Sequence, residues 1–289
     1  MHEINNFNIK ENGFHGCLFQ ATQPWQDNKV LIVCGGSNGN FRLTSLLSKT
    51  LCNQGIGVLA LAYINVPGLP KHTIEAPVES VENAVNWLSN NGYDKIGIYG
   101  ISSGGELALL SASLIPQITC TVAISAPSAV SQADNGFTHK NTSCWSWRNK
   151  PIPFLHTNYS LIRAIPQSIK NKELYTSHFY ERALNSANDN IWIQIENING
   201  SVLFLTAKND SLCPSNFYAN IAIRRLNSKG FTHNYEHITY EYASHFLLPV
   251  KNLESVPLKV FKIERRFPQE CANSRVDSLA KTIEWLKKW

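Results

Sequence analysis

A serine stands between two glycines in the motif Gly100-Ile101-Ser102-Ser103-Gly104. Residues 95–99 before this motif have the apolar composition of a short buried strand, and residues 106–115 after it are typical of a helix. A serine on a tight strand-to-helix turn adopts strained backbone angles, and glycines two residues before and after it relieve the crowding. The free N–H groups at the start of the helix would face an oxyanion formed beside the serine. The pattern therefore predicts that Ser102 is a catalytic nucleophile.

A serine nucleophile needs a histidine to take its proton and a carboxylate to orient that histidine. After a turn of this kind both partners come later in the chain, the acid first, each just past the C-terminal end of a strand. Asp210 follows the apolar run at residues 201–206, and His245 follows the run at residues 235–242. We therefore expect a catalytic triad of Ser102, Asp210 and His245.

Other histidines and carboxylates fit these two roles less well. His233 precedes its predicted strand, and His237 lies inside it, where a structural role is the default. Asp134 and Asp189 fall in or beside an irregular stretch of the chain, and Glu196 comes before the relevant strand. A single loop aspartate or histidine is usually a turn former or a surface residue.

Two backbone N–H groups are expected to bind the oxyanion. One belongs to Ser103, the residue after the nucleophile, and the other to the loop after the first long strand, where Gly36 or Ser37 can supply it. The glycines of this loop are also compatible with a plain tight turn. A phosphate-binding loop is disfavoured, because no Gly-Lys-Ser/Thr follows them.

Strands and helices alternate along most of the chain. Strands are expected at residues 30–34, 56–62, 95–99, 119–124, 201–206 and 235–242. Helices are expected near residues 43–55, at 106–115 and at 215–229, after Pro77, and at the C-terminal end with Val276, Leu279, Ile283 and Leu286. Near-continuous apolar strands that alternate with helices indicate the α/β class, with a mostly parallel sheet covered by helices on both faces.

Several positions on these helices carry specific expectations. Pro77 is expected in the first turn of its helix, where a missing N–H costs nothing. Phe217, Ile221 and Leu226 are expected to point inward from the helix at residues 215–229, and Val276 is part of the apolar set on the closing helix.

The alternation breaks down at about residues 131–200, which hold several aromatic residues and prolines. A structureless loop of this length is improbable in a compact domain, and disordered segments are poor in aromatic residues. We therefore expect an inserted cap, or a long ordered excursion over the sheet, within a single catalytic domain at residues 1–289. Trp145 and Trp147 are expected to line a substrate pocket there.

The composition excludes several classes of protein. A chain of 289 residues that is 43% hydrophobic can build one sizeable core. We expect neither a signal peptide nor a membrane span. Seven cysteines, odd in number and without metal-ligand spacing, favour reduced thiols in a cytoplasmic protein, and no metal site is expected. No cofactor is expected either. The net charge of +5 is dispersed, which disfavours nucleic-acid binding and leaves an anionic substrate open.

Several segments resemble a known family. They are Cys34-Gly35-Gly36-Ser37-Asn38-Gly39, residues 58–63, Gly68-Leu69-Pro70-Lys71, residues 84–88, residues 97–107 and residues 209–215. In these segments the chain resembles the C-terminal catalytic domain of the acyl-CoA thioesterase and bile acid-CoA:amino acid N-acyltransferase family. That family belongs to the α/β-hydrolases, and the resemblance runs from about Val30 to the end of the chain.

The resemblance implies an α/β-hydrolase fold, acyl-CoA thioesters as substrates and an acyl group that passes through Ser102 to water. It implies the same triad as the spacing does. Two features depart from the family. Members with the full architecture carry an N-terminal β-sandwich, whereas only about thirty residues precede the first long strand here. Part of the usual surface that contacts the acyl group or CoA is therefore expected to be missing. The transferase branch places a cysteine where Ser102 stands.

The sequence therefore predicts a serine hydrolase that cleaves an acyl thioester, carried by CoA or by a carrier, through an acyl-enzyme. The alternatives are a carboxylester hydrolase of the dienelactone-hydrolase kind and an acyl-CoA:amino acid N-acyltransferase. A non-catalytic binding module is less favoured, since such proteins usually lose a member of the triad. The expected partner is a small-molecule ester or thioester, and the oligomeric state is not predicted.

Overall fold

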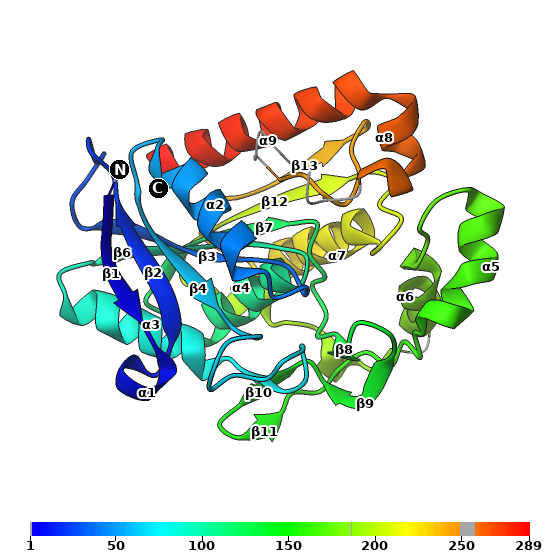
Figure 1. Cartoon of the computed structure of the whole chain (residues 1–289), viewed down its shortest axis with the longest axis horizontal. Coiled ribbons are helices and arrows are strands. Elements are labelled where there is room, and N and C mark those ends of the chain that lie inside the picture. Colours follow the sequence, from blue (N-terminus) through cyan, green and yellow to red (C-terminus); the bar gives the residue numbers. More distant parts are fainter. Residues whose placement is uncertain (1, 186, 249–257) are drawn as a thin grey trace.

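The computed structural model describes residues 2–185, 187–248 and 258–289 (Figure 1). In this part of the chain a sheet of eight strands has the order β1-β2-β4-β3-β6-β7-β12-β13. The strands are β1 (His2–Phe7), β2 (His15–Gln20), β3 (Lys29–Cys34), β4 (Gly57–Ala62), β6 (Lys95–Ile101), β7 (Ile118–Ile124), β12 (Ser201–Ala207) and β13 (Tyr235–Tyr240). All neighbours from β4 to β13 are parallel, whereas β1 and β2 are antiparallel to their neighbours.

Helices cover both faces of this sheet because each central strand is apolar on both sides. In β3, Val30 and Ile32 belong to one hydrophobic core and Leu31 and Val33 to the other. The first core takes residues from α3 (Glu79–Asn90), α4 (Ser103–Leu114) and α7 (Ser215–Ser228). The second takes residues from α2 (Phe41–Cys52) and α9 (Pro268–Lys288), so these two helices lie on the opposite face (Figure 1). The predicted α/β class and mostly parallel sheet are confirmed.

Four local features differ from the expectations. The antiparallel strands β1 and β2, joined by α1 (Ile9–Asn12), were not predicted. Pro77 lies in the short strand β5 (Ala76–Pro77), and α3 begins only at Glu79. Phe217 is exposed on α7, where the neighbouring Tyr218 is buried instead, and Val276 is exposed on α9. The other members of the predicted apolar set on α9, Leu279, Ile283 and Leu286, do pack against or within the core, and Leu226 of α7 is buried as predicted.

Residues 131–200 contain short regular elements. They are β8 (Gln132–Asp134), β9 (His139–Ser143), β10 (Trp145–Trp147), β11 (Lys150–Pro151), α5 (Leu161–Asn171), α6 (Ser177–Leu184) and the 3-10 turns η1 (Asp189–Ile191) and η2 (Ile195–Asn197). β10 pairs with β5, which connects this segment to the chain before α3. Its role as a cap over a site stays a prediction.

A sharp turn joins β6 to α4 at Ser102, whose φ of 54° and ψ of −124° lie in a region that side chains rarely adopt. A Cβ atom built on Gly100 would collide with the backbone of Gly104, and one built on Gly104 would collide with the carbonyl oxygen of Gly35. Backbones therefore approach here as closely as only glycine permits. Both glycines of the predicted motif are therefore required by close packing: Gly100 against Gly104, and Gly104 against Gly35.

Replacing Gly104 with alanine is expected to lower the free energy of unfolding by about 3 kcal/mol or more, because the backbone it would strike cannot move without distorting β3. Gly36→Ala is the matched control, since its Cβ would meet its nearest neighbours at 4.0 Å, and a loss under about 1 kcal/mol is expected. Urea denaturation measures both. Equal losses in the two variants would contradict this account of the turn.

Candidate active site

His245 and Asp210 form a buried pair beyond the ends of β13 and β12. The Nδ1 atom of His245 lies 2.8 Å from Oδ2 of Asp210, and the two side chains are only 5% and 1% exposed. A carboxylate oxygen only accepts, so Nδ1–H of the imidazole donates to it. This bond leaves Nε2 with its lone pair free to accept a proton, as a general base requires.

Asp210 is itself held in place by its surroundings. Its Oδ1 atom accepts hydrogen bonds from the backbone N–H groups of Leu212 (3.0 Å) and Cys213 (3.2 Å). Its Oδ2 atom accepts a third from the Ser215 hydroxyl at 2.7 Å. These donors compensate the carboxylate for its burial and fix the direction from which it contacts His245.

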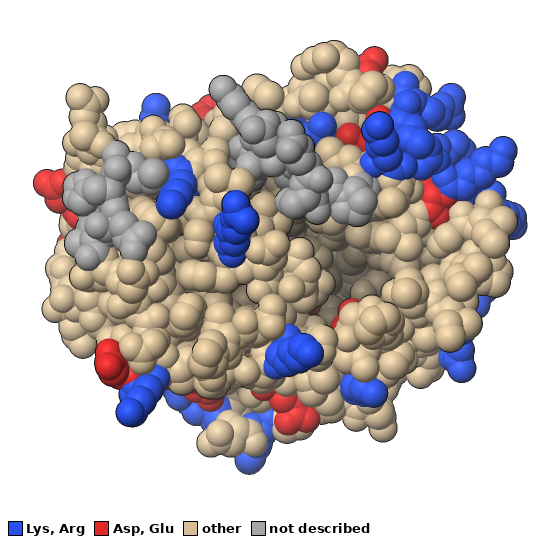
Figure 2. Space-filling view, viewed as in Figure 1, with Lys and Arg blue, Asp and Glu red and all other residues tan. Residues whose placement is uncertain are grey.

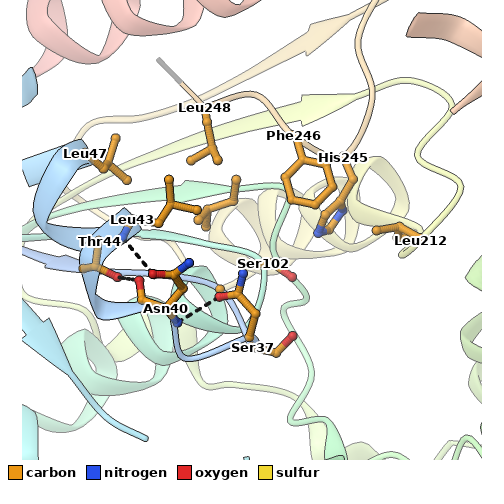
Figure 3. Close-up of a pocket in the computed structure, with 14 residues that line it drawn as sticks. Ser37, Asn40, Leu43, Thr44, Leu47, Ser102, Leu212, His245, Phe246 and Leu248 are labelled. Atoms are coloured by element: carbon orange, nitrogen blue, oxygen red, sulfur yellow. Dashed lines mark hydrogen bonds between the residues drawn. The ribbon is translucent and has the colours of Figure 1, made fainter. Parts of the chain in front are cut away.

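Ser102 shares two cavities with His245. The first, of about 140 Å³, is lined by both residues together with the loop after β3 and the start of α2 (Figure 3). In this view the imidazole ring of His245 points toward Ser102, and Leu43, Leu47, Phe246 and Leu248 form an apolar side of the cavity. The structure therefore brings the three residues of the predicted triad to one place.

The loop at Gly36 and Ser37 lies against the same serine. Both residues line the first cavity, and a Cβ atom built on Gly36 would be 4.0 Å from Cβ of Ser102. The Tyr63 hydroxyl donates to the carbonyl of Gly35 at 2.9 Å, which holds the start of this loop. Ser103 follows Ser102 as the first residue of α4. The predicted oxyanion donors thus lie next to Ser102, and their use as an oxyanion hole stays a prediction.

The second cavity, of about 330 Å³, lies between Ser102 and the segment at residues 131–180, and it is more polar. Burial lowers the pKa of His139 to about 4, so this imidazole is neutral near pH 7. Burial also raises the pKa of Asp134, one of the carboxylates that the spacing argument set aside. Further polar side chains line this cavity, namely Thr73, Ser131, Gln132, Tyr159, Thr176 and Tyr180.

Glu106, one turn into α4, is a fully buried carboxyl group that the sequence analysis did not single out. It accepts hydrogen bonds from the Ser131 backbone (2.7 Å), the Ser131 hydroxyl (2.5 Å) and Nε1 of Trp145 (2.7 Å). Burial raises its pKa, and these hydrogen bonds oppose that rise. Glu106 therefore fixes two points of the 131–180 segment relative to Ser102. A glutamate in an otherwise apolar helix was the available signal.

Trp145 and Trp147 have other roles than the predicted one. Trp145 is fully buried, and its ring contacts Tyr63 edge-on at 5.2 Å. Trp147 packs against the core, with the Arg148 guanidinium 4.1 Å from its ring centre. Neither tryptophan is among the described residues that line the two cavities at Ser102. Trp145 is buried in the scaffold and Trp147 is half-buried, so smaller and more polar neighbours line the cavities.

Two of the other candidates for the acid and base, His237 and Glu196, are engaged elsewhere. Nε2 of His237 is hydrogen-bonded to the Thr206 hydroxyl at 2.8 Å within the sheet. Glu196 forms an ion pair with Arg225 at 2.5 Å. Among the described residues, no group of three or more His, Cys, Asp or Glu side chains is arranged to hold a metal ion. No helix in the same ranges is long and apolar enough to cross a membrane.

The buried carboxyl of Glu106 predicts a pH dependence of stability. Because burial raises its pKa, the folded chain keeps this proton at pH values where the unfolded chain has released it. The contribution of Glu106 to the free energy of unfolding therefore falls as pH rises from about 4.5 to the raised pKa, and is constant above it. Glu106→Gln is expected to remove this decline in urea denaturation at a series of pH values.

The exposed Glu270 at the start of α9 supplies the control, and Glu270→Gln is expected to keep the wild-type pH profile. A wild-type profile in Glu106→Gln would contradict the proposed burial of the carboxyl.

Known structures share this architecture. A putative dienelactone hydrolase from Klebsiella pneumoniae subsp. pneumoniae superposes with a TM-score of 0.59 at 14% identity over 100% of both chains. A sugar hydrolase from Lactococcus lactis gives a TM-score of 0.61 at 15% identity, covering 99% of this chain and 98% of that one. The fold is therefore the α/β-hydrolase fold, as the resemblance implied.

Curated relatives are similar over most of this chain. Acyl-coenzyme A thioesterase 1 of Homo sapiens is 28% identical over 83% of this chain and 54% of its own length. Mitochondrial acyl-coenzyme A thioesterase 2 of Rattus norvegicus is 30% identical over 83% and 49%. The bile acid-CoA:amino acid N-acyltransferase of Mus musculus is 26% identical over 85% and 55%. The chain thus spans about half the length of these relatives.

A family model covers most of the segment that carries the site. The model "BAAT / Acyl-CoA thioester hydrolase C terminal" matches residues 76–252, which include Ser102, Asp210 and His245. The chain belongs to this family.

Proposed function

We propose that this chain is a serine hydrolase that cleaves acyl thioesters, with Ser102 as nucleophile, His245 as general base and Asp210 as the carboxylate that orients it. The observation that carries the proposal is the buried 2.8 Å contact between His245 and Asp210 beside two cavities that Ser102 shares. A buried pair of this kind would be costly to keep if it served stability alone.

The proposed reaction has two stages. Nε2 of His245 takes the Ser102 proton as Oγ attacks the thioester carbonyl, and N–H groups of Ser103 and of Gly36 or Ser37 bind the oxyanion. The tetrahedral intermediate then expels the thiolate, which leaves as a thiol with the proton from the imidazolium. In the second stage His245 activates a water that attacks the acyl-enzyme, and the free acid leaves.

The two cavities suit the two parts of such a substrate. The apolar side of the first, formed by Leu43, Leu47 and Leu248, favours an aliphatic acyl chain. The polar lining of the second favours the amide-containing arm of a thiol such as CoA. The acyl pocket is thereby assigned to α2 and the segment after β13, in place of the two tryptophans.

The relatives support an acyl-CoA substrate, since several are named acyl-CoA thioesterases. Others are named N-acyltransferases, which makes transfer to an amino acid the competing outcome. An oxygen ester on Ser102 is less open to amines than a thioester on cysteine. We therefore propose that water is the acceptor and that free acid is released even when glycine or taurine is present.

Substitution of the triad is expected to remove thioester hydrolysis without unfolding the chain. Ser102→Ala and His245→Ala should each lower kcat by about 10⁵-fold or more, and Asp210→Ala by about 10⁴-fold, because the three act as a unit. Thiol release from an acyl-CoA, followed with a thiol reagent, measures the rate, and thermal unfolding reports the fold.

His237→Ala is the matched control, because this histidine is hydrogen-bonded to Thr206 in the sheet and lines neither cavity. Its rate should stay within about ten-fold of the wild type. If His237→Ala lowered the rate as much as His245→Ala while the fold stayed intact, the assignment of His245 as the general base would be wrong.

Filling the first cavity is expected to change acyl-chain preference. Leu43→Trp should lower kcat/KM for long acyl chains by about ten-fold or more relative to short ones, since Leu43 lines that cavity. Leu46→Trp on the same helix is the control, because Leu46 is exposed and lines neither cavity. Kinetics with acyl-CoA esters of graded length measure both.

An unchanged chain-length profile in Leu43→Trp, combined with a changed preference between CoA and a short thiol, would place the leaving group in the first cavity instead of the acyl chain.

A further inference from the structure

Helix α5 exposes apolar side chains. Ala164 is the residue of α5 that is buried, whereas Ile162 is 79% and Ile169 is 71% exposed. Ile165, between them, is also exposed, and the three share one side of the helix. The backbone N–H of Leu161 donates to the carbonyl of Phe137 at 2.8 Å, which places the 70% exposed Phe137 at the start of the same helix. Phe137, Ile162, Ile165 and Ile169 together form an exposed apolar surface, which we call the apolar stripe.

A helix on the surface of a soluble domain ordinarily turns its apolar side toward the core. Here the spacing is that of an amphipathic helix, but the apolar side faces away from the sheet. Exposed apolar surface of this extent marks a contact with something outside the chain. The apolar stripe is therefore expected to contact a molecule outside this chain.

Positive charge flanks the apolar stripe. Arg265 of α8 (Lys262–Arg266) donates to the carbonyl of Lys259 at 2.6 Å and to the carbonyl of Lys172, so α8 is joined to the C-terminal end of α5. Lys and Arg side chains gather over this junction in Figure 2. The exposed members of this basic rim are Arg163, Lys170, Lys172, Lys259, Lys262, Arg265 and Arg266. Two carboxylates lie among them: Glu173 accepts from the Lys262 backbone at 3.1 Å, and the buried Glu264 of α8 pairs with Arg275 at 2.6 Å.

We propose that α5 binds the surface of an anionic lipid membrane, with the apolar stripe in the boundary between headgroups and acyl chains. Apolar side chains beside lysine and arginine are the combination that such surfaces bind, and each cation near the surface adds to the attraction. A second copy of this chain fits less well as the partner, because it would bring two basic rims together.

The apolar stripe lies next to the second cavity, which Ser102 lines. Leu161 and Leu174 line the second cavity, and the same two residues line an open apolar groove with Ile165, Ile169 and Val260. An acyl chain held in a membrane would therefore be close to the entrance of the site when α5 is bound. This step rests on the proposed function, whereas membrane binding itself does not.

Sedimentation with lipid vesicles tests the proposal on the full chain. Binding is expected to vesicles of phosphatidylcholine with added phosphatidylglycerol, and to be much weaker with phosphatidylcholine alone. Ile162→Ser with Ile169→Ser should weaken binding by about ten-fold or more, because both side chains would lose their apolar contact. The control is Val276→Ser, which removes an equally exposed apolar residue from α9 and should bind as the wild type does.

The charges are tested separately. Lys170→Gln with Lys172→Gln should weaken binding to the anionic vesicles by about ten-fold or more, and added salt should weaken wild-type binding in the same way. Ser102→Ala should bind vesicles like the wild type. A failure of the hydrolase proposal would therefore leave this result unaffected.

Three results would overturn the proposal. The first is no sedimentation of the wild type with anionic vesicles. The second is equal binding by the Ile162→Ser, Ile169→Ser variant. The third is a dimer, detected by light scattering, that those two substitutions dissociate in a chain that binds no vesicles, which would assign the stripe to self-association.

Discussion

The close approach of three backbones, at Gly100, Gly104 and Gly35, is the constraint on which the site depends. It allows the chain to turn from β6 into α4 with Ser102 in a left-handed conformation, so that the serine faces the cavities and not the sheet. The same contact presses the start of α4, which carries Ser103, against the loop after β3, which carries Gly36 and Ser37. The oxyanion donors that we propose lie on these two segments. One packing contact thus positions both Ser102, the nucleophile that we propose, and its proposed oxyanion donors.

A second layer of the site is electrostatic. Asp210 is satisfied by backbone N–H groups and a hydroxyl, so its charge is kept within hydrogen-bonding reach of His245 despite burial. Glu106 plays the corresponding role for the segment at residues 131–180, since it ties Ser131 and Trp145 to α4. Asp210 thus fixes the residues beyond the ends of β12 and β13, and Glu106 fixes the 131–180 segment on α4.

The central sheet could be predicted because its strands are apolar on both sides, as in β3 with all six residues buried. The positions of Asp210 and His245 followed from the same pattern, since residues just past parallel strands meet at one edge. The sequence did not predict which side chains each buried residue contacts. Nothing in the periodicity separates a buried Trp145 from a pocket residue, and α5 places its apolar side outward against the rule that predicts the reverse.

Covalent labelling with a fluorophosphonate tests the central claim most directly, because the reagent reports the activated serine itself. The account predicts one adduct per chain, located at Ser102 by mass spectrometry of peptides, and strongly reduced in His245→Ala. Labelling at another serine, or labelling of Ser102 that does not depend on His245, would contradict it.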